Sequence, residues 1–366
     1  MESLPPSMPP PATAGSVHPN ELQMMEMDVD GDLVLRVGSE LGKAQDFRVC
    51  SATMRRASPI WKVMLFGPWK EAKPTEGNWC VDLPDDNPWP TGILLAIIHS
   101  KFDLVQQVKS LDEVHEILLL ADKYDMTAFL QPWASCWIYL RLRPPPGSPS
   151  RVTGRELMLR IHVAWELGDE GRLSSVITNL VFSVSISNDS DSETQISYKG
   201  ETIRPEQNHG PPDLLELIQK RRLALIQKLL DFYHGEVNRR TTDTPDRTLS
   251  GSWDPVRTQR DCQLLGSTWG SQRQRLEELG PLPTQATAVA QSANVVMYAL
   301  SAVFACGRGR ARSLHPDRKR RDPSLVYQDF LAIIDEQKME RDVLEPHHKE
   351  RLAAQRMKMG LDTGAS

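Results

Sequence analysis

The sequence predicts an α+β fold in which a small sheet with helices comes first and a mostly α-helical domain follows. Residues 32–37 (DLVLRV) alternate apolar and polar side chains, which is typical of a half-buried strand. Between 110 and 124, apolar residues recur at helical spacing, which predicts a helix with one buried face. The same spacing returns after residue 150, and it predicts further helices there.

Local capping signals place the first helices. Ser58 suits an N-cap, and Pro59 suits the first helical position, where its missing N–H is not needed. Gly67 is expected to end this helix in a left-handed conformation. Ser110 and Glu113 match a capping box at the start of a later helix. The other strands and helices expected in this part are 47–50, 79–83, 89–100 and 110–124.

The second half is expected to be helical. Thr153 and Glu156 match a capping box that opens a helix pair over 153–183, and a long helix is expected after Asp213 and Glu216. The expected organisation is a disordered tail (1–27), a first domain (28–130), a helical extension (131–238) with an acidic, serine-rich loop (183–197), a linker (239–260), a helical region (261–345) with a basic loop (308–321), and a C-terminal tail (346–366).

Composition limits the class of protein. The chain has 366 residues, a net charge of −5 and a pI near 6.0, which argues against a general nucleic-acid binder. Its five cysteines are scattered without zinc-type spacing, and the N-terminus has no signal-peptide pattern, so an intracellular protein is expected, in the nucleus or the cytoplasm. The most apolar uninterrupted segment, 295–306, is too short to span a membrane.

Three phrases in the first domain carry a family resemblance. FRVCSATMRRASPIWKVML (47–65), HSKFDLV (99–105) and EVHEILLLADKYDM (113–126) follow the expected strands and helices in an order that resembles the BTB/POZ domain. The second half is similar to helical regions of filamentous-fungal BTB proteins, through WELGDE (165–170), PPDLLELI (211–218) and CQLLGS (262–267). The resemblance implies an interaction module that self-associates or docks protein partners.

Dimerising BTB domains of the transcription-factor type pair an early strand aspartate with a basic residue, and Asp32 matches that aspartate. This chain departs from the pattern, because Cys50 and Ser51 occupy the histidine and basic positions. An unpaired buried carboxylate would be costly, so Asp32 is expected to hydrogen-bond locally. A homodimer formed through an apolar helix face stays open.

Binding to a cullin-type ubiquitin-ligase scaffold is a further function that the resemblance implies. BTB proteins that bind cullins often carry an apolar-x-Glu motif, and Trp69 and Glu71 match it. A tryptophan presented on a loop would fill a partner pocket well. The alternative is that Trp69 folds back over the core while Glu71 is solvated.

A run of basic residues lies near the end of the chain. Arg318, Lys319, Arg320 and Arg321 could be read by a nuclear import receptor, or they could form a solvated loop. Direct nucleic-acid binding is not expected, because no DNA-binding motif accompanies them.

No catalytic, cofactor-binding or metal-binding motif is recognised. His162 is interpreted as a residue at the edge of the core, and His347 and His348 as part of a charged tail. The sequence therefore predicts a protein–protein interaction module without catalysis or cofactors. The alternatives are a substrate adaptor of a cullin-type ubiquitin ligase and a nuclear transcriptional regulator.

Overall fold

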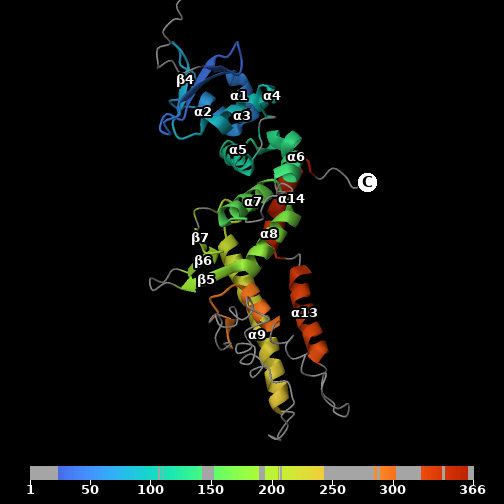
Figure 1. Ribbon diagram of the computed structural model, residues 1–366. Helices are drawn as coiled ribbons and strands as arrows, with labels where there is room; N and C mark the ends of the chain where they lie inside the picture. Colours follow the sequence, from blue (N-terminus) through green and yellow to red (C-terminus); the bar gives the residue numbers. More distant parts are fainter. Residues whose placement is uncertain are drawn as a thin grey trace, which may run out of the picture. The chain divides into compact units, whose positions relative to one another are not determined.

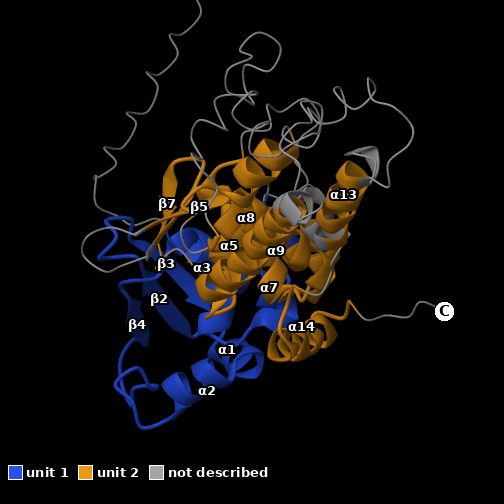
Figure 2. Ribbon diagram, turned by 90° about the horizontal axis from the view of Figure 1, so that it is seen from below, with its two compact units in different colours: residues 1–108, 119–129 blue, residues 109–118, 130–366 orange. Residues whose placement is uncertain are grey.

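The computed structural model describes residues 24–105, 108, 110–141, 152–188, 194–204, 206, 208–242, 284–286, 289–301, 323–339 and 343–361 (Figure 1). It is a mixed α+β structure with two compact units, one made of 1–108 and 119–129, the other of 109–118 and 130–366 (Figure 2). Most of the expected N-terminal tail, most of the linker, the first part of the expected helical region (261–283) and the basic loop lie outside the described residues.

The first unit contains a four-stranded sheet in the order β1-β3-β2-β4. Its strands are β1 (Met25–Glu26), β2 (Leu33–Val37), β3 (Gln45–Val49) and β4 (Cys80–Leu83). β2 pairs antiparallel with β3 and parallel with β4, so Leu35 lies between Phe47 and Val81. The alternation that predicted β2 is confirmed, because Leu33, Leu35 and Val37 are buried while Arg36 is exposed.

The first unit also contains helices. They are α1 (Ser51–Ala57), α2 (Pro59–Phe66), α3 (Pro88–Ile98), α4 (Phe102–Val105) and the C-terminal residues of α5 (Leu111–Lys123). Ser58 caps α2 as predicted, since its side chain accepts a hydrogen bond from the Trp61 N–H. The expected left-handed cap at Gly67 is wrong: its φ is −92°. Glycine is needed there for a different reason, because a Cβ would lie 2.4 Å from the Val63 carbonyl oxygen.

The second unit is mainly helical. Besides the first residues of α5 it contains α6 (Gln131–Arg141), α7 (Gly154–Glu166), α8 (Glu170–Ser183), α9 (Leu214–Thr242), α13 (Pro323–Met339) and α14 (Pro346–Lys358), and residues 293–301 are also helical. A short 3-10 helix (Thr127–Leu130) precedes α6. α7 and α8 form the predicted helix pair, and Thr153 caps α7.

Two predictions about this unit are wrong. The expected loop at 183–197 instead carries β5 (Val184–Asn188) and β6 (Thr194–Tyr198), which form an antiparallel sheet with β7 (Glu201–Ile203). The reason is that Ile186 and Ile196 face each other across the pair and are buried, while the serines alternate with them. The expected tail at 346–366 begins with α14, whose Leu352 is buried.

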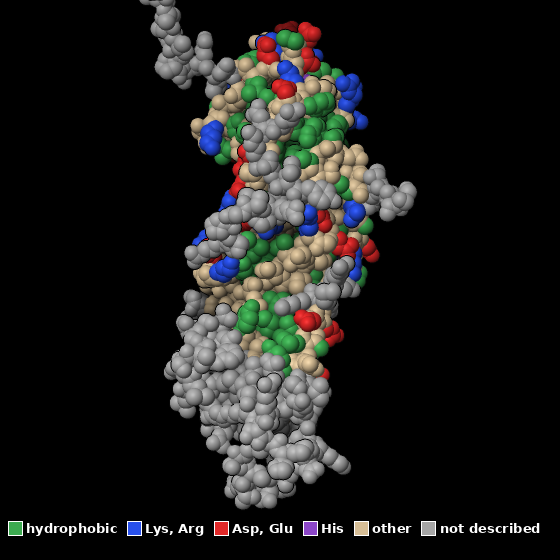
Figure 3. All heavy atoms as spheres, turned by 45° about the vertical axis from the view of Figure 1, so that its right-hand side comes forward, with side chains coloured by type: hydrophobic (Ala, Val, Ile, Leu, Met, Phe, Trp, Pro, Cys, Tyr) green, Lys and Arg blue, Asp and Glu red, His purple; other side chains and the backbone are tan. Residues whose placement is uncertain are grey.

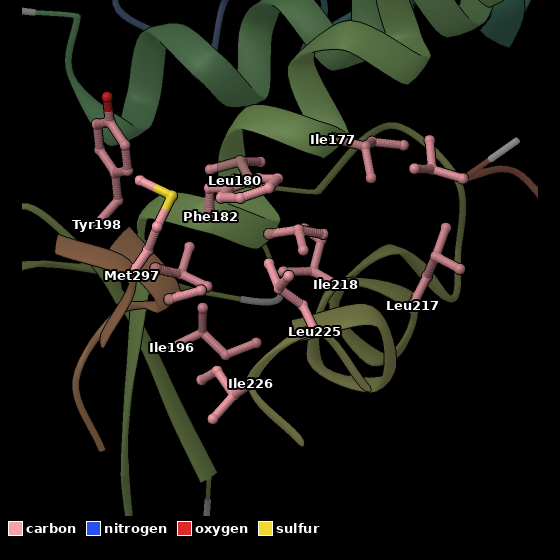
Figure 4. Packing of buried hydrophobic residues seen from close by; sticks show 14 of the residues in the cluster. Ile177, Leu180, Phe182, Ile196, Tyr198, Leu217, Ile218, Leu225, Ile226 and Met297 are labelled. Carbon is pink, nitrogen blue, oxygen red and sulfur yellow. The ribbon is translucent and has the colours of Figure 1, made fainter. Parts of the chain in front are cut away.

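A single apolar cluster holds the second unit together. Side chains from α8, β6, α9 and the helical segment 293–301 meet in it; they include Ile177, Leu180, Ile196, Ile218, Leu225 and Met297 (Figure 4). Arg222 of α9 is also fully buried. Its guanidinium donates hydrogen bonds to the carbonyl oxygens of Val184, Val289, Ala290 and Gln291. Arg222 therefore ties α9 to β5 and to the segment that precedes 293–301.

Candidate functional site

One side of α2 and the turn that follows it exposes large apolar side chains. Ile60, Val63, Phe66 and Trp69 lie three residues apart and are 45%, 56%, 43% and 59% exposed. The opposite side of the helix is buried through Trp61 and Leu65. Residues three apart share a helix face, so Ile60, Val63 and Phe66 lie on one side of α2, and Trp69 follows them in the turn. These four side chains are here named the α2 face. In Figure 3, apolar side chains are visible on the surface of this unit between Lys and Arg side chains.

Basic residues predominate in the segment that carries the α2 face. Residues 51–73 contain a single acidic side chain, and their five basic residues are all exposed: Arg55, Arg56, Lys62, Lys70 and Lys73. The Arg55 guanidinium lies 5.0 Å from the centre of the Phe66 ring, within the range of a cation–π contact. The α2 face is thus an apolar surface flanked by basic side chains, which are called its basic border below.

The structure treats the two residues of the apolar-x-Glu motif differently. Trp69 is the most exposed of the α2-face residues, so it does not fold back into the core. The Glu71 side chain is only 21% exposed, and its carboxylate lies 3.6 Å from Lys70 Nζ. The Glu71 carbonyl oxygen accepts a hydrogen bond from Trp79 Nε1. Trp69 is available to a partner, whereas Glu71 is largely taken up within the fold.

Asp32 makes local hydrogen bonds, as expected. Its carboxylate accepts from the Ser51 N–H at 2.8 Å and from Ser51 Oγ at 2.9 Å, and it lies 3.3 Å from Lys73 Nζ. Burial by itself would raise the pKa of Asp32, but the Ser51 hydrogen bonds and the Lys73 charge hold it below its usual value. A carboxylate at the first residue of α1 also suits the helix dipole. Asp32 therefore has a structural role at the start of α1.

A buried polar network supports α2 from below. The carboxylate of Asp86 accepts hydrogen bonds from Tyr124 Oη and Lys123 Nζ. Ser58 Oγ, besides capping α2, donates to the Tyr124 carbonyl oxygen. The Tyr124 ring stacks on Trp61 with ring centroids 4.4 Å apart. These contacts fix the orientation of α2, and hence the direction in which its exposed face points.

In the second unit, three histidines that the sequence did not single out as a group lie together. His115 comes from α5, His162 from α7, and His209 from the segment before α9. His115 Nδ1 and His162 Nδ1 are 2.7 Å apart. Burial, together with nearby positive groups, lowers the pKa of His115 to about 4 and shifts the pKa of His162 down as well. No spacing in the sequence signals this group, because its members are 47 residues apart in each step.

A second group joins the starts of α9 and α14. Asp213, His347 and His348 bring possible ligand atoms within 4.8 Å of one another. His348 Nδ1 accepts a hydrogen bond from the Glu345 N–H, so its proton lies on Nε2, which donates to Asp213 at 2.7 Å. Both ring nitrogens of His348 are thereby used. This pattern indicates a structural link, because a metal would need the nitrogen that carries the proton.

The remaining candidate residues lie outside the part of the chain that the structure describes. Arg318, Lys319, Arg320 and Arg321 lie outside the described residues, so their proposed role in nuclear import stays a prediction. Within the part of the chain that the structure describes, no helix combines the length and the apolar character that crossing a bilayer requires.

Comparisons with known proteins found no relative of this chain. No family model, no curated protein and no solved structure matches this chain. The resemblance to BTB/POZ domains therefore rests on the phrases in the sequence and on the order of the elements that contain them.

Proposed function

We propose that this chain is a protein-interaction module of the BTB/POZ type, and that it docks a protein partner through the α2 face. The observation that carries the proposal is the strip of four large apolar side chains, each more than a third exposed, on α2 and the turn that follows it. The other side of α2 is buried. Water-exposed apolar strips are common at binding surfaces, and aromatic residues often contribute most of the binding energy. Phe66 and Trp69 would be the main contacts.

The charge around the strip favours one kind of occupant. Of the five exposed cations, Lys70 and Lys73 pair with Glu71 and Asp32. A second copy of the same surface would still bring Arg55, Arg56 and Lys62 against like charges, which opposes symmetric self-association. A partner segment that combines bulky apolar side chains with Asp or Glu matches both the strip and its border. The proposed occupant is therefore an acidic, amphipathic segment of another protein.

The test begins with the full-length protein carrying a photo-crosslinking amino acid at Val63, irradiated in its native cell. The crosslinked segment is identified by mass spectrometry, synthesised, and titrated against the purified full-length protein. The expected segment is acidic and amphipathic, and its affinity should fall at least about tenfold with Val63→Glu or Trp69→Ala, as for hot-spot residues. Val29→Glu is the matched control, because Val29 is 73% exposed and belongs to the turn between β1 and β2 instead of to the α2 face.

Added salt should weaken the binding if the basic border contributes. Crosslinks found only to a second copy of the chain would overturn the choice of occupant. Equal loss of affinity with Val29→Glu would overturn the choice of surface.

The exposed position of Trp69 favours one particular partner class as a second candidate. A cullin-type scaffold would make the chain a ubiquitin-ligase adaptor, and Trp69 would then fill a scaffold pocket. The partial burial of Glu71 limits what the second half of that motif can contribute. Recovery of a cullin segment at the Val63 crosslink, with binding lost in Trp69→Ala but kept in Glu71→Gln, is the result expected for this candidate.

A further inference from the structure

A pair of histidines joins α5 to α7 in the second unit, and a third histidine lies beside them. His115 Nδ1 and His162 Nδ1 are 2.7 Å apart, so one ring donates a hydrogen bond and the other accepts it. Their ring centroids are 4.5 Å apart, and the His209 ring lies 5.1 Å from His115 and 5.7 Å from His162. The hydrogen-bonded pair of His115 and His162 is here named the histidine contact.

The histidine contact cannot hold all the protons that two imidazoles can take up. Its hydrogen bond needs one Nδ1 that carries a proton and one Nδ1 that does not. When both rings are protonated, two N–H groups face each other and the hydrogen bond is lost. Because His162 is only 2% exposed, water cannot solvate its charged ring while the two histidines stay together. Full protonation therefore requires His115 and His162 to separate.

The groups around His115 come from α5, α7 and the segment before α9. Burial is the main reason that the pKa of His115 is lowered to about 4, and the nearby His209 and Arg155 lower it further. Asp112 of α5 acts in the opposite direction, but it forms an ion pair with Arg155 of α7. The surroundings of His115 therefore favour its neutral form.

The groups around His162 favour its neutral form as well. Burial lowers the pKa of His162, and the charges that His115, His209 and Arg351 can bring lower it further. Arg351 belongs to α14 and lies 3.0 Å from the carboxylate of Glu166 of α7. The positive groups act on His162 in the same direction as its burial, so both rings of the histidine contact are held neutral.

The histidine contact lies outside the apolar cluster that holds the second unit together. Within the described residues, that cluster includes Leu157 and Ile161 of α7 but no residue of α5. The ion pair between Asp112 and Arg155 also joins α5 to α7, but its side chains are 47% and 66% exposed, and such pairs stabilise little. The apolar cluster can therefore stay intact when the histidine contact opens.

We propose that the histidine contact is a pH-sensitive joint: in mild acid His115 and His162 separate, and residues 111–118 move away from α7, while the apolar cluster stays folded. A separated imidazole has an ordinary pKa near 6.5, so opening takes up about two protons below that pH. The ratio of open to closed molecules then rises up to about 100-fold for each pH unit, until the closed form itself takes up protons. The histidine contact is thus stable above about pH 6.5 and weakens as the pH falls.

The test is amide hydrogen exchange of the full-length protein, measured by mass spectrometry at a series of pH values and divided by the intrinsic exchange rate at each pH. Residues 111–118 report opening of the joint, and residues 225–230 of α9, whose apolar side chains belong to the cluster, report unfolding of the second unit. From pH 6 to pH 5 the corrected exchange of 111–118 should rise more than about tenfold and up to about 100-fold. At pH 5 it should be at least about 100-fold faster than that of 225–230, because only the joint opens.

His115→Asn is the informative variant, because the asparagine amide can donate a hydrogen bond from the position of Nδ1 but does not titrate. Its exchange at 111–118 should rise no more than about tenfold over the same pH unit, since only His162 is left to take up a proton. His347→Gln is the matched control: it removes an exposed histidine elsewhere in the second unit, and it should follow the wild type. Circular dichroism checks that both variants are folded.

Three results would overturn the proposal. One is exchange of 111–118 in the wild type that does not rise in acid, and another is exchange as slow as that of 225–230 at pH 5, which would mean that the second unit unfolds as a whole. Both comparisons use the wild type alone, so they stand whether or not a variant folds. The third is a His115→Asn protein whose exchange rises as steeply as that of the wild type. None of these results bears on docking at the α2 face, because the histidine contact shares no residue with that surface.

Discussion

The hydroxyl of Tyr124 at the end of α5 donates a hydrogen bond to the carboxylate of Asp86, which is 4% exposed and precedes α3. Burial raises the pKa of Tyr124, and Asp86 raises it further, so the phenol stays protonated and remains the donor. Lys123 binds the other carboxylate oxygen at 2.6 Å. The buried Asp86 carboxylate thus links the segment before α3 to the end of α5.

Tyr124→Phe should lower the free energy of unfolding by about 1–3 kcal/mol, because it leaves a buried carboxylate oxygen without its donor. Urea unfolding followed by tryptophan fluorescence measures the change. Lys123→Gln is the comparison, since the Lys123 side chain is 54% exposed and should cost less than about 1 kcal/mol. A Tyr124→Phe protein as stable as the wild type would show that the hydrogen bond contributes little.

Arg222→Met should destabilise the second unit by about 3 kcal/mol, since it leaves several buried carbonyl oxygens without donors. Arg222→Lys should recover part of the loss, because an ammonium group can still donate to some of these oxygens. Thermal unfolding followed by circular dichroism gives the order of the three proteins. A methionine variant at least as stable as the wild type would mean that burying the guanidinium costs as much as its hydrogen bonds return.

Gly168→Ala should cost more than Gly200→Ala, although both glycines have a positive φ. A Cβ at Gly168 would lie 2.5 Å from the backbone nitrogen of Arg356 in α14, whereas a Cβ at Gly200 meets nothing within 4 Å. The Gly200 variant should lose only about 1 kcal/mol from backbone strain, and the Gly168 variant should lose more because α14 must move. Chemical unfolding of both variants measures the difference, and equal losses would contradict the contact with α14.

The stability of the protein should fall as the pH falls from about 7 to about 4. Burial lowers the folded-state pKa of His115 and of His162 below 6.5, so in this range the unfolded chain takes up protons that the folded chain does not. The stabilisation is complete above the unfolded pKa and is lost below it, at up to about 1.4 kcal/mol per pH unit for each histidine. His209, Arg155 and Arg351 oppose protonation, and Asp112 favours it.

His162→Gln should flatten this pH dependence, because glutamine does not titrate and can still hydrogen-bond to His115. Urea unfolding at a series of pH values compares the two proteins. Groups away from the histidine cluster titrate equally in both, so the difference between the curves reports His162 and its coupling to His115 and His209. Parallel curves would show that His162 keeps an ordinary pKa in the folded protein.

The parts of the fold that the sequence predicted well are those in which the signal is local. The strand at β2 follows from alternation over six residues, and the Ser58 cap of α2 from neighbours within three positions. The Ser110–Glu113 capping box is confirmed in both directions. The hairpin of β5 and β6 was missed because its acidic connection suggested a loop, although Ile186 and Ile196 already alternated with serines.

The candidate sites depend mostly on contacts for which the sequence contains no local signal. The sequence left open whether Trp69 is presented on the loop or folds back over the core, and only the structure shows it exposed. The partial burial of the Glu71 side chain likewise has no signal in the sequence. The histidine group could not be anticipated, since His115, His162 and His209 become neighbours only when α5, α7 and the segment before α9 pack together.

The sequence by itself determined the α+β class, the N-caps of several helices and the buried face of α5, because side-chain periodicity and capping act over a few residues. Only the tertiary structure decided that α14 is a helix held by Asp213 and His348, and that three histidines meet in the second unit. Those arrangements join residues 47 to 135 positions apart, and their energies depend on burial that no local pattern contains.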